Sequence, residues 1–510
     1  MTHNDSPLHI LAVDIGTSHV KAILYSNRSG IISQESEHYD TYYPRPDLVE
    51  QDPDEIFAAT LKVIKRLMDS SQVSAKEITT FVFAGILQSM IAVDKNGEPL
   101  SRALNWADRR SIAQNSFLKT KMDSEVVKQR TGCTLHPMYF LSRLEWFKQE
   151  APDVFNKTER FVSIKEFILQ RLFGVKQIDY SVASGTGIWN MKAKDWDREL
   201  LSEIDISVNR FSECVETNTI LSKGLKNPYA TQIGLLEGTP GVIGAFDGGL
   251  AHLGSIGIDP NRISLTVSTG AALRRLVTSP RIIPGSEAWC YYLAEDNWLL
   301  GGVLHDSGNV LKWFADRMMP EFENNENAYL QLDKMARETP AGAEGLFFIP
   351  HLGGERCPHY FPDSKGLIYG LTFTHGLNHM VRAMMEGLSY NLYSVYRMLA
   401  PDLKPELVVT GGILKSPTWL KILASFFQRT LWLPRIKETT AWGAVMLAQK
   451  AIGSIQSFHE LDDFLKPIEN QEPDIENRKI YQELLFGYDQ LYEKMYGIGN
   501  NTKSWTGDKP

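Results

Sequence analysis

Two segments about half a chain apart share one plan, and this internal echo constrains the fold more than any other feature. Residues 11–26 (LAVDIGTSHVKAILYS) follow the order strand, Gly/Thr turn, strand. Residues 263–279 (ISLTVSTGAALRRLVTS) repeat that order after the Gly/Pro-bearing connection GSIGIDPNR. Each segment predicts a hairpin with a glycine-rich turn. We therefore predict two domains of related plan, with the boundary near Gly257.

The size and composition of the chain agree with this division. A chain of 510 residues is too long for one core. Its net charge of −8 and isoelectric point near 5.9 argue against a general nucleic-acid or anionic-membrane surface. No apolar run approaches the roughly 18 residues of a membrane span, and the N-terminus lacks a signal-peptide pattern. The four cysteines form no CxxC pair. We expect a cytoplasmic protein with reduced thiols.

Strand-like and helix-like segments alternate along most of the chain, which predicts the α/β class. The spacing predicts an amphipathic helix over residues 50–69, with Asp52 as its N-cap and Pro53 at its first position. A buried strand that opens into a loop is predicted over residues 78–90. Residues 377–399 keep helical apolar spacing, which is typical of core packing.

Glycine-rich turns carry the clearest chemical signal in the sequence. The motifs GxxxxGK[ST], GxGxxG, HExxH and GxSxG are absent, so P-loop hydrolysis, dinucleotide redox, zinc proteolysis and α/β-hydrolase chemistry lose support. The backbone N–H groups of the two hairpin turns can cradle phosphate oxygens. A third site, residues 406–427 (ELVVTGGILKSPTWLKILASFF), predicts a strand, two glycines and a helix. The three together favour nucleotide binding.

Two aspartates stand at special places, and each has two interpretations. Asp14 follows a buried strand, where it is either an ordinary turn residue or an acid that needs a partner. Asp247 lies among glycines just before the predicted boundary, where it is either a helix N-cap or a general base in an interdomain cleft. Together the two acids could hold Mg²⁺ through waters and leave one carboxylate for a hydroxyl proton.

These motifs resemble the FGGY family of carbohydrate kinases, within the actin/hexokinase/Hsp70 superfamily, from about residue 11 to residue 453. The resemblance implies two actin-like (ribonuclease H-like) α/β domains with a central interdomain cleft. We place an N-terminal domain at residues 8–256, a nucleotide-binding domain at 257–460 and a partly helical extension with a frayed end at 461–510. The implied reaction moves the γ-phosphoryl group of ATP, with Mg²⁺, to a terminal hydroxyl of a sugar or sugar acid.

The resemblance also implies roles for residues in the matching motifs. Asp247 is the implied catalytic base, and Asp14 and Asp247 are implied to lie near Mg²⁺. The residues implied to contact ATP lie in four glycine-bearing motifs: Gly16, Thr17, Ser18, Lys21, Thr269, Gly270, Gly308, Gly411 and Gly412. The chain has Ser268 and Ser307 at two positions where the family usually has glycine, which requires only small backbone adjustments.

Within the family, the segments LNWADRRS, TGCTLHPM and DYSVASGTGIWN look most like gluconate kinases. This resemblance implies D-gluconate as substrate and 6-phosphogluconate as product, with a ketose such as xylulose as the alternative. One departure affects the sugar. Related gluconate and xylulose kinases tend to have Met-His in the loop where this chain has Leu87-Gln88.

The predicted sugar contacts are Gln88, Ser89, Asp108, Arg109 and Asp247. Each has a structural alternative: Gln88 could satisfy loop backbone groups, and Asp108 could cap the helix that starts near Ser111. Arg109 and Arg110 could form a solvated basic pair. A bidentate arginine is the strongest available partner for a substrate carboxylate, which favours Arg109.

The remaining expectations concern His136 and the partners of the protein. His136, directly before a proline, is more typical of a structural histidine than of a ligand. We expect no nucleic-acid or membrane partner, and a homodimer is possible. A non-enzymatic, nucleotide-switched module of the chaperone or filament kind is the rival class.

Overall fold

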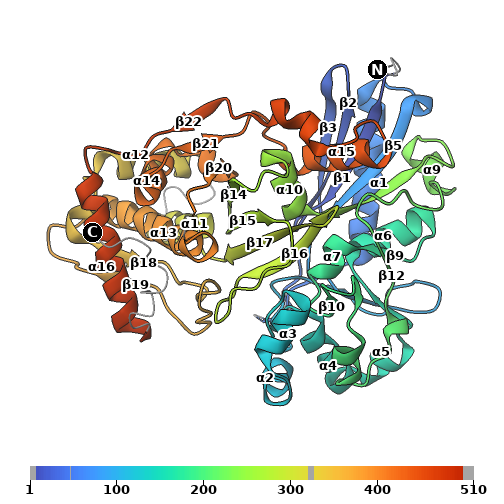
Figure 1. The fold of residues 1–510 in the computed structure, drawn as a ribbon, viewed down its shortest axis with the longest axis horizontal. Coiled ribbons are helices and arrows are strands. Elements are labelled where there is room, and N and C mark those ends of the chain that lie inside the picture. The colour runs from blue at the N-terminus through green and yellow to red at the C-terminus, as the bar shows by residue number, and fades with distance from the viewer. Residues whose placement is uncertain (1–6, 46, 320–326, 402, 498–510) are drawn as a thin grey trace.

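Two large sheets divide the protein, as Figure 1 shows. The computed structural model describes residues 7–45, 47–319, 327–401 and 403–497. The N-terminal sheet has the order β13-β5-β1-β2-β3. Its strands are β1 (His9–Ile15), β2 (His19–Ser26), β3 (Gly30–His38), β5 (Ile78–Gly85) and β13 (Gly241–Phe246). β1 and β2 form the predicted hairpin, in which Asp14 pairs with Lys21, and β1 runs parallel to β5.

The C-terminal sheet contains the second predicted hairpin. Its order is β16-β17-β15-β14-β20-β21-β22. The strands are β14 (Arg262–Val267), β15 (Ala271–Val277), β16 (Trp289–Ala294), β17 (Asn297–Leu304), β20 (Glu406–Thr410), β21 (Leu431–Leu433) and β22 (Glu469–Gln471). β14 and β15 pair in antiparallel fashion, and β14 runs parallel to β20. The two hairpins therefore occupy corresponding places in the two sheets, which confirms the prediction of a repeated plan.

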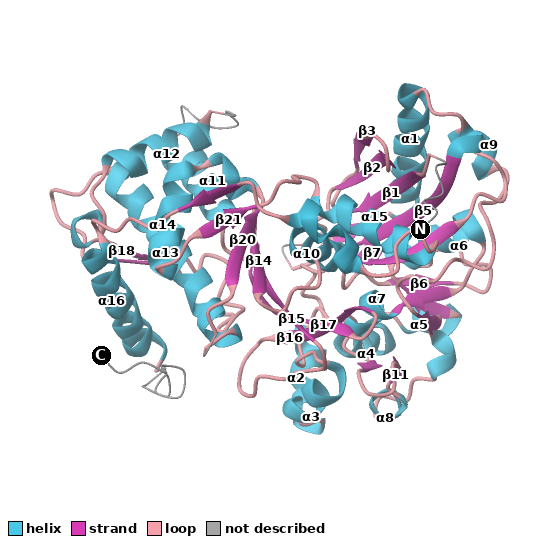
Figure 2. Ribbon diagram, turned by 45° about the horizontal axis from the view of Figure 1, so that its top comes forward, coloured by secondary structure: helices cyan, strands magenta, loops and turns pink. Residues whose placement is uncertain are grey.

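Both faces of the N-terminal sheet are covered by helices. α1 (Pro53–Ser71) packs on β2 and β3, and α15 (Thr439–Ala451) packs on β1 and β5. The side chains of β1 are almost all buried because alternate residues face these two layers. The predicted start of α1 is confirmed, since Asp52 caps it by accepting from Asp54 N–H at 3.0 Å. Figure 2 shows α1 and α15 beside these strands.

α15 connects the two halves of the protein. It lies within residues 257–460, yet it covers the N-terminal sheet and crosses α10 (Asp247–Ile256). At this crossing, a Cβ atom added to Gly254 would lie 1.9 Å from the carbonyl oxygen of Thr439, and one added to Gly443 would lie 2.0 Å from that of Leu250. Two glycines thus allow the helices that join the two halves to approach closely.

A helical and short-stranded region extends from the N-terminal sheet. Its helices are α2 (Ile112–Lys121), α3 (Ser124–Thr131), α4 (Phe140–Glu150), α5 (Pro152–Lys157), α6 (Ile164–Phe173), α7 (Tyr180–Ser184), α8 (Arg198–Ser202) and α9 (Tyr229–Ile233). Its strands pair in twos: β4 (Glu50–Gln51) with β7 (Ala103–Leu104), β6 (Ile91–Val93) with β8 (Arg160–Val162), β9 (Gln177–Asp179) with β12 (Glu213–Val215), and β10 (Trp189–Asn190) with β11 (Asp195–Trp196).

The helices of the C-terminal half gather around α13 (Leu377–Leu399), the long helix that the spacing predicts. The other elements are α11 (Gly308–Met318), α12 (Ala328–Glu338), α14 (Pro417–Phe427), α16 (Arg478–Tyr496) and the pair β18 (Phe347–Ile349) and β19 (Leu367–Tyr369). The predicted apolar stripe of α13 is buried except at Leu377, which is 42% exposed at the helix start.

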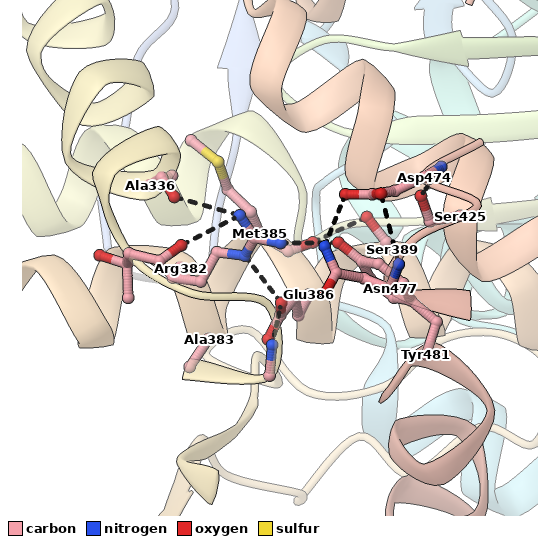
Figure 3. A network of polar contacts seen from close by, with 12 residues as sticks. Ala336, Arg382, Ala383, Met385, Glu386, Ser389, Ser425, Asp474, Asn477 and Tyr481 are labelled. Atoms are coloured by element: carbon pink, nitrogen blue, oxygen red, sulfur yellow. Dashed lines mark hydrogen bonds and ion pairs between the residues drawn. The ribbon is translucent and has the colours of Figure 1, made fainter. Parts of the chain in front are cut away.

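The segment predicted as a C-terminal extension belongs to the C-terminal body. β22 adds an edge strand to the sheet, and α16 buries Tyr481, Tyr488 and Tyr492. Figure 3 shows how α16 is joined to α13: Arg382 donates to Glu386 at 2.7 Å and to the Tyr481 hydroxyl at 2.6 Å. The predicted frayed end, residues 500–510, lies outside the described residues.

Among the described residues, no helix is both long enough and apolar enough to cross a membrane. The four cysteines are unpaired, and three of them are buried.

Candidate active site

A cavity of about 540 Å³ lies where the two halves of the protein meet. Both hairpin turns reach its wall, through Thr17 and through Thr269 and Gly270. The start of α10 contributes Asp247 to the same wall. The cavity therefore brings together the two turns and the predicted base, as an interdomain reaction site requires.

Asp247 is the first residue of α10, and its side chain does not cap the helix in the usual way. The N-cap position is Phe246, and Asp247 Oδ1 accepts from the N–H of Gly248 at 2.6 Å. Burial in the cleft raises the pKa of Asp247, while the Gly248 N–H and the charge of Arg274 lower it. A carboxylate that is held at one oxygen and open to a cavity suits proton acceptance from a hydroxyl.

Asp14, near the end of β1, is a second acid that interacts with Asp247, although it does not itself line the cavity. Its Oδ1 is buried and has no hydrogen-bond partner among the described residues. Burial and the negative charge of Asp247 raise the pKa of Asp14 to about 7, although Lys21 opposes this shift. An orphaned carboxylate oxygen beside a second acid fits a hydrated cation.

The donor set is compatible with Mg²⁺ in particular. The described residues contain no group of three or more His, Cys, Asp or Glu side chains that could enclose a metal. Mg²⁺ typically keeps several waters and takes one or two carboxylates together with substrate phosphates. Asp14 and Asp247 supply carboxylates of that number.

The first turn is held in shape by contacts from outside the hairpin. The carbonyl of Gly16 accepts from the Tyr39 hydroxyl, and the carbonyl of Thr17 accepts from Gln51 Nε2 at 2.5 Å. Thr17 and Ser18 are exposed. Lys21, which the resemblance places near the phosphates, has its Nζ 2.7 Å from Glu438 Oε2.

The second turn joins the other predicted nucleotide glycines. The Gly308 N–H donates to the carbonyl of Ser268 at 2.8 Å, and the Gly412 N–H donates to Ser268 Oγ at 3.2 Å. A Cβ atom on Gly308 would lie 2.4 Å from the Ser268 carbonyl oxygen, and one on Gly411 would lie 2.4 Å from that of Val267. Ser268 thus connects the second turn with both the Gly308 motif and the Gly411-Gly412 motif.

The two residues of the predicted sugar loop have different surroundings. Gln88 lines the cavity with a backbone φ of 55°, a conformation that non-glycine residues rarely adopt and that is often found at functional sites. Its Nε2 donates to Tyr291 Oη at 3.3 Å. Ser89 does not line the cavity, because its hydroxyl accepts from the Ile164 N–H at the start of α6. The Gln88 Nε2 also donates to the Gly185 carbonyl at 3.3 Å, so this amide satisfies a loop backbone group and the sugar contact of Gln88 stays a prediction. The contact of Ser89 fits a structural role.

Asp108 and Arg109 both line the cavity, but Asp108 is buried and Arg109 is exposed. Asp108 does not cap α2, since its carboxylate accepts from the Val49 N–H at 2.8 Å and pairs with Arg110. Arg110 also pairs with Glu50 and is almost buried, so it is not part of a solvated basic pair. Asp108 therefore holds the loop in shape, but it also lines the cavity, so its sugar contact stays a prediction. Arg109 is exposed at the cavity wall, as a ligand contact requires.

The cavity contains three residues that the sequence did not single out. Arg356 Nη1 lies 3.1 Å from His305 Nε2, and both residues line the cavity with Arg109. Arg356 and Arg109 lower the pKa of His305 to about 3, after the larger effect of burial, so this imidazole stays neutral. The third residue is Arg274, beside Asp247. Arg356 lies in the glycine-bearing segment GGERCP (residues 353–358), which is a signal that could have marked it. Arg274 lies within strand β15, where no local pattern marks it.

His136 lies at the same end as Arg356. Its Nδ1 accepts from the Met138 N–H at 3.1 Å, and burial and Arg356 keep its pKa well below the usual value. The structural role expected for His136 accounts for these contacts.

Comparison with known proteins decides the family of this site. The model of the FGGY family of carbohydrate kinases matches the chain twice: its N-terminal domain over residues 9–254 and its C-terminal domain over residues 276–452. The protein belongs to the FGGY family of carbohydrate kinases. It is therefore a phosphotransferase with an alcohol acceptor, its family uses ATP, and the alternative of a non-enzymatic module is excluded.

The relatives of this FGGY kinase are similar along almost the whole chain. A gluconokinase of Bacillus licheniformis is 35% identical, with 94% of each chain covered, and one of Bacillus subtilis is 34% identical over 96% of this chain and 97% of its own. The crystal structure of a gluconate kinase from Lactobacillus acidophilus has a TM-score of 0.89 at 28% identity, covering 96% of this chain and 99% of its own. These matches confirm the predicted two-domain α/β fold of the actin-like ATPases.

Proposed function

We propose that this FGGY kinase phosphorylates the terminal hydroxyl of D-gluconate and releases 6-phosphogluconate. The main support for this substrate is the pair of guanidinium groups, Arg109 and Arg356, at the cavity wall. A sugar acid brings a carboxylate that a neutral ketose lacks, and guanidinium groups bind carboxylates through paired, charge-assisted hydrogen bonds. The names of the similar gluconokinases support the same substrate.

The two ends of the cavity suit the two ends of such a substrate. Arg356 lies 3.1 Å from His305 and lines the cavity together with Arg109 and His136, whereas Arg274 lies against Gly248, the residue next to Asp247. Gluconate carries its carboxylate and its primary hydroxyl at opposite ends of a six-carbon chain. If Arg109 and Arg356 bind the carboxylate, the primary hydroxyl at the other end of the chain is free to reach Asp247.

The catalytic roles follow from this placement. Asp247 accepts the hydroxyl proton as the hydroxyl oxygen attacks the γ-phosphorus of ATP, and the bond from that phosphorus to the bridging oxygen of ADP breaks. Asp14 and Asp247 would hold Mg²⁺, which neutralises phosphate charge when bound. The N–H groups of the two turns, with Lys21, would orient the phosphates. Positioning and charge stabilisation supply most of the rate in phosphoryl transfer.

The deciding experiment is a coupled ADP-release screen with gluconate, xylulose, ribulose, glycerol and fuculose as acceptors. We expect gluconate to have the highest kcat/KM. A higher value for a neutral ketose or polyol would overturn the sugar-acid assignment and leave the kinase assignment intact.

We also propose that the enzyme works in the cytoplasm, where ATP is available, as a homodimer. Exposed apolar side chains gather on β19 and the segment after it, and a second copy would cover them: Ile368, Tyr369, Leu371, Phe373 and Leu377. Light scattering of the purified protein measures the mass directly, and a monomer at micromolar concentration would contradict the dimer.

A further inference from the structure

The space beside Gly248 in α10 is occupied by the side chain of Arg274 from the other half of the protein. Gly248 directly follows the base, and a Cβ atom added to it would lie 2.5 Å from Nη2 of Arg274 and 3.0 Å from its Nε and Cζ. Arg274 belongs to β15 in the C-terminal sheet, whereas Gly248 is the second residue of α10. The absence of a side chain at position 248 thus gives the guanidinium its place beside Asp247.

The guanidinium of Arg274 has unused donors in that place. Its Nη1 donates to Thr266 Oγ1 at 3.3 Å, and its Nε is buried without a partner among the described residues. Burial lowers the pKa of Arg274 to about 10, although Asp247 raises it. A buried donor without a partner is costly. Arg274 also lines the cavity, so the accessible end of its guanidinium can donate to an acceptor atom of a bound molecule.

Arg274 shares the cavity wall with Asp247 and with the aromatic residues Trp289 and Tyr291. Its guanidinium lies against Gly248, the residue that directly follows the base. A molecule bound in the cavity can therefore contact the Asp247 carboxylate and the Arg274 guanidinium together.

We propose that Arg274 is a substrate-binding residue that holds the reactive end of the acceptor, donating from Nη2 to the hydroxyl next to the one that is phosphorylated. Gly248 is the specificity determinant that leaves room for it. This inference rests on the proposed function for the identity of the acceptor. It adds a second contact beside Asp247, so that the attacking hydroxyl is fixed in direction as well as in distance.

The first test measures gluconate binding by calorimetry without ATP, so that turnover plays no part. Arg274→Gln should weaken binding about 10- to 100-fold, the worth of hydrogen bonds from a charged group, and Arg274→Lys should restore part of it. Gly248→Ala should fold normally, because the crowded atoms end a flexible side chain, and should weaken binding by displacing the guanidinium. Arg275→Gln is the matched control. Arg275 follows Arg274 on β15, donates to the Leu399 carbonyl and does not line the cavity.

The second test removes the proposed partner from the substrate. The wild type should prefer gluconate to 5-deoxygluconate about tenfold or more in kcat/KM, and Arg274→Gln should lose that preference. An unchanged preference in Arg274→Gln overturns the proposal, as does a fall in kcat with gluconate binding unaltered. Equal losses in Arg275→Gln would also overturn it, by showing that the strand alone is disturbed.

The two tests separate this inference from the proposed substrate. If the screen shows that the wild type uses a ketose instead of gluconate, the assignment of the substrate fails. The same variants are then compared on that ketose and on its analogue without the neighbouring hydroxyl. A preference that survives Arg274→Gln there overturns the role of Arg274.

Discussion

Lys21 and Glu438 form an ion pair of 2.7 Å between the strand that follows the first turn and the residue that precedes α15. The two residues are 417 positions apart in the chain. Their side chains are 36% and 33% exposed, so the pair adds little stability. We expect this ion pair to compete with phosphate binding, because Lys21 can bind phosphate oxygens only after it leaves the Glu438 carboxylate.

We therefore expect Glu438→Gln to lower the KM for ATP by about twofold to fivefold, the equivalent of a partly exposed ion pair. The melting temperature should change little. Steady-state kinetics with varied ATP give the answer, with Lys21→Met as the opposite control, in which the KM should rise. An unaltered KM in both variants would assign the lysine a structural role.

Asp247→Asn should retain ATP binding and lose turnover about 10²- to 10⁴-fold, the usual contribution of a positioned base. The asparagine still accepts from the Gly248 N–H through its amide oxygen, so the start of α10 is preserved. ATP binding by calorimetry and turnover by coupled assay are measured on the same preparation. Turnover within threefold of the wild type would contradict the role of Asp247.

Asp14 gives a prediction for stability against pH. Its pKa of about 7 in the folded protein lies above the value near 3.9 of an unfolded chain. The folded state therefore holds a proton that the unfolded state releases, and the free energy of unfolding falls as the pH rises from about 4 to about 7. Asp14→Asn removes this loss. In EDTA, the variant should be the more stable protein at pH 8, and the difference should shrink toward pH 4.

The same variant tests the metal role. Asp14→Asn should need more Mg²⁺ for half-maximal activity, because one carboxylate is lost from the site. Urea unfolding at several pH values and a Mg²⁺ titration give the two readouts. A variant that unfolds easily and keeps a normal Mg²⁺ dependence would show that Asp14 is a purely structural acid.

The network of Figure 3 predicts how firmly α16 is held. Tyr481→Phe removes the hydroxyl that accepts from the buried Arg382 guanidinium at 2.6 Å, which should cost about 1–3 kcal/mol in the free energy of unfolding. Tyr488→Phe is the matched control, since that hydroxyl makes only contacts of 3.4 Å. Urea unfolding compares the two. A larger loss in Tyr488→Phe would contradict the importance of the network.

The sequence indicates the parts of this protein that are encoded locally. Asp52 and Pro53 mark the start of α1, and the apolar spacing marks α13, because capping and periodicity act within a few residues. The two hairpins and Asp247 follow from local motifs for the same reason.

The remaining features depend on contacts between distant segments. The approach of Gly254 to Thr439, the pairing of Lys21 with Glu438 and the place of Arg274 beside Gly248 each join parts of the chain that no local pattern connects. Asp108 shows the same limit, since its partner at the Val49 N–H is 59 residues away. Local patterns predicted which elements form, and the packing between the two halves decided what surrounds the base.

The carboxylate end of the cavity gives the last prediction. Arg109→Gln should lower kcat/KM for gluconate by the worth of a charged hydrogen bond, roughly 1.5–3 kcal/mol, and should leave ATP affinity almost unchanged. Arg356→Gln should act in the same direction, because both guanidinium groups face this end of the cavity. Arg102→Gln is the control: this exposed arginine stacks on Tyr42, 3.9 Å from the ring centroid, and does not line the cavity. A neutral acceptor should be indifferent to the loss of Arg109. If turnover of a neutral acceptor falls as much as that of gluconate, Arg109 supports the loop and does not bind a carboxylate.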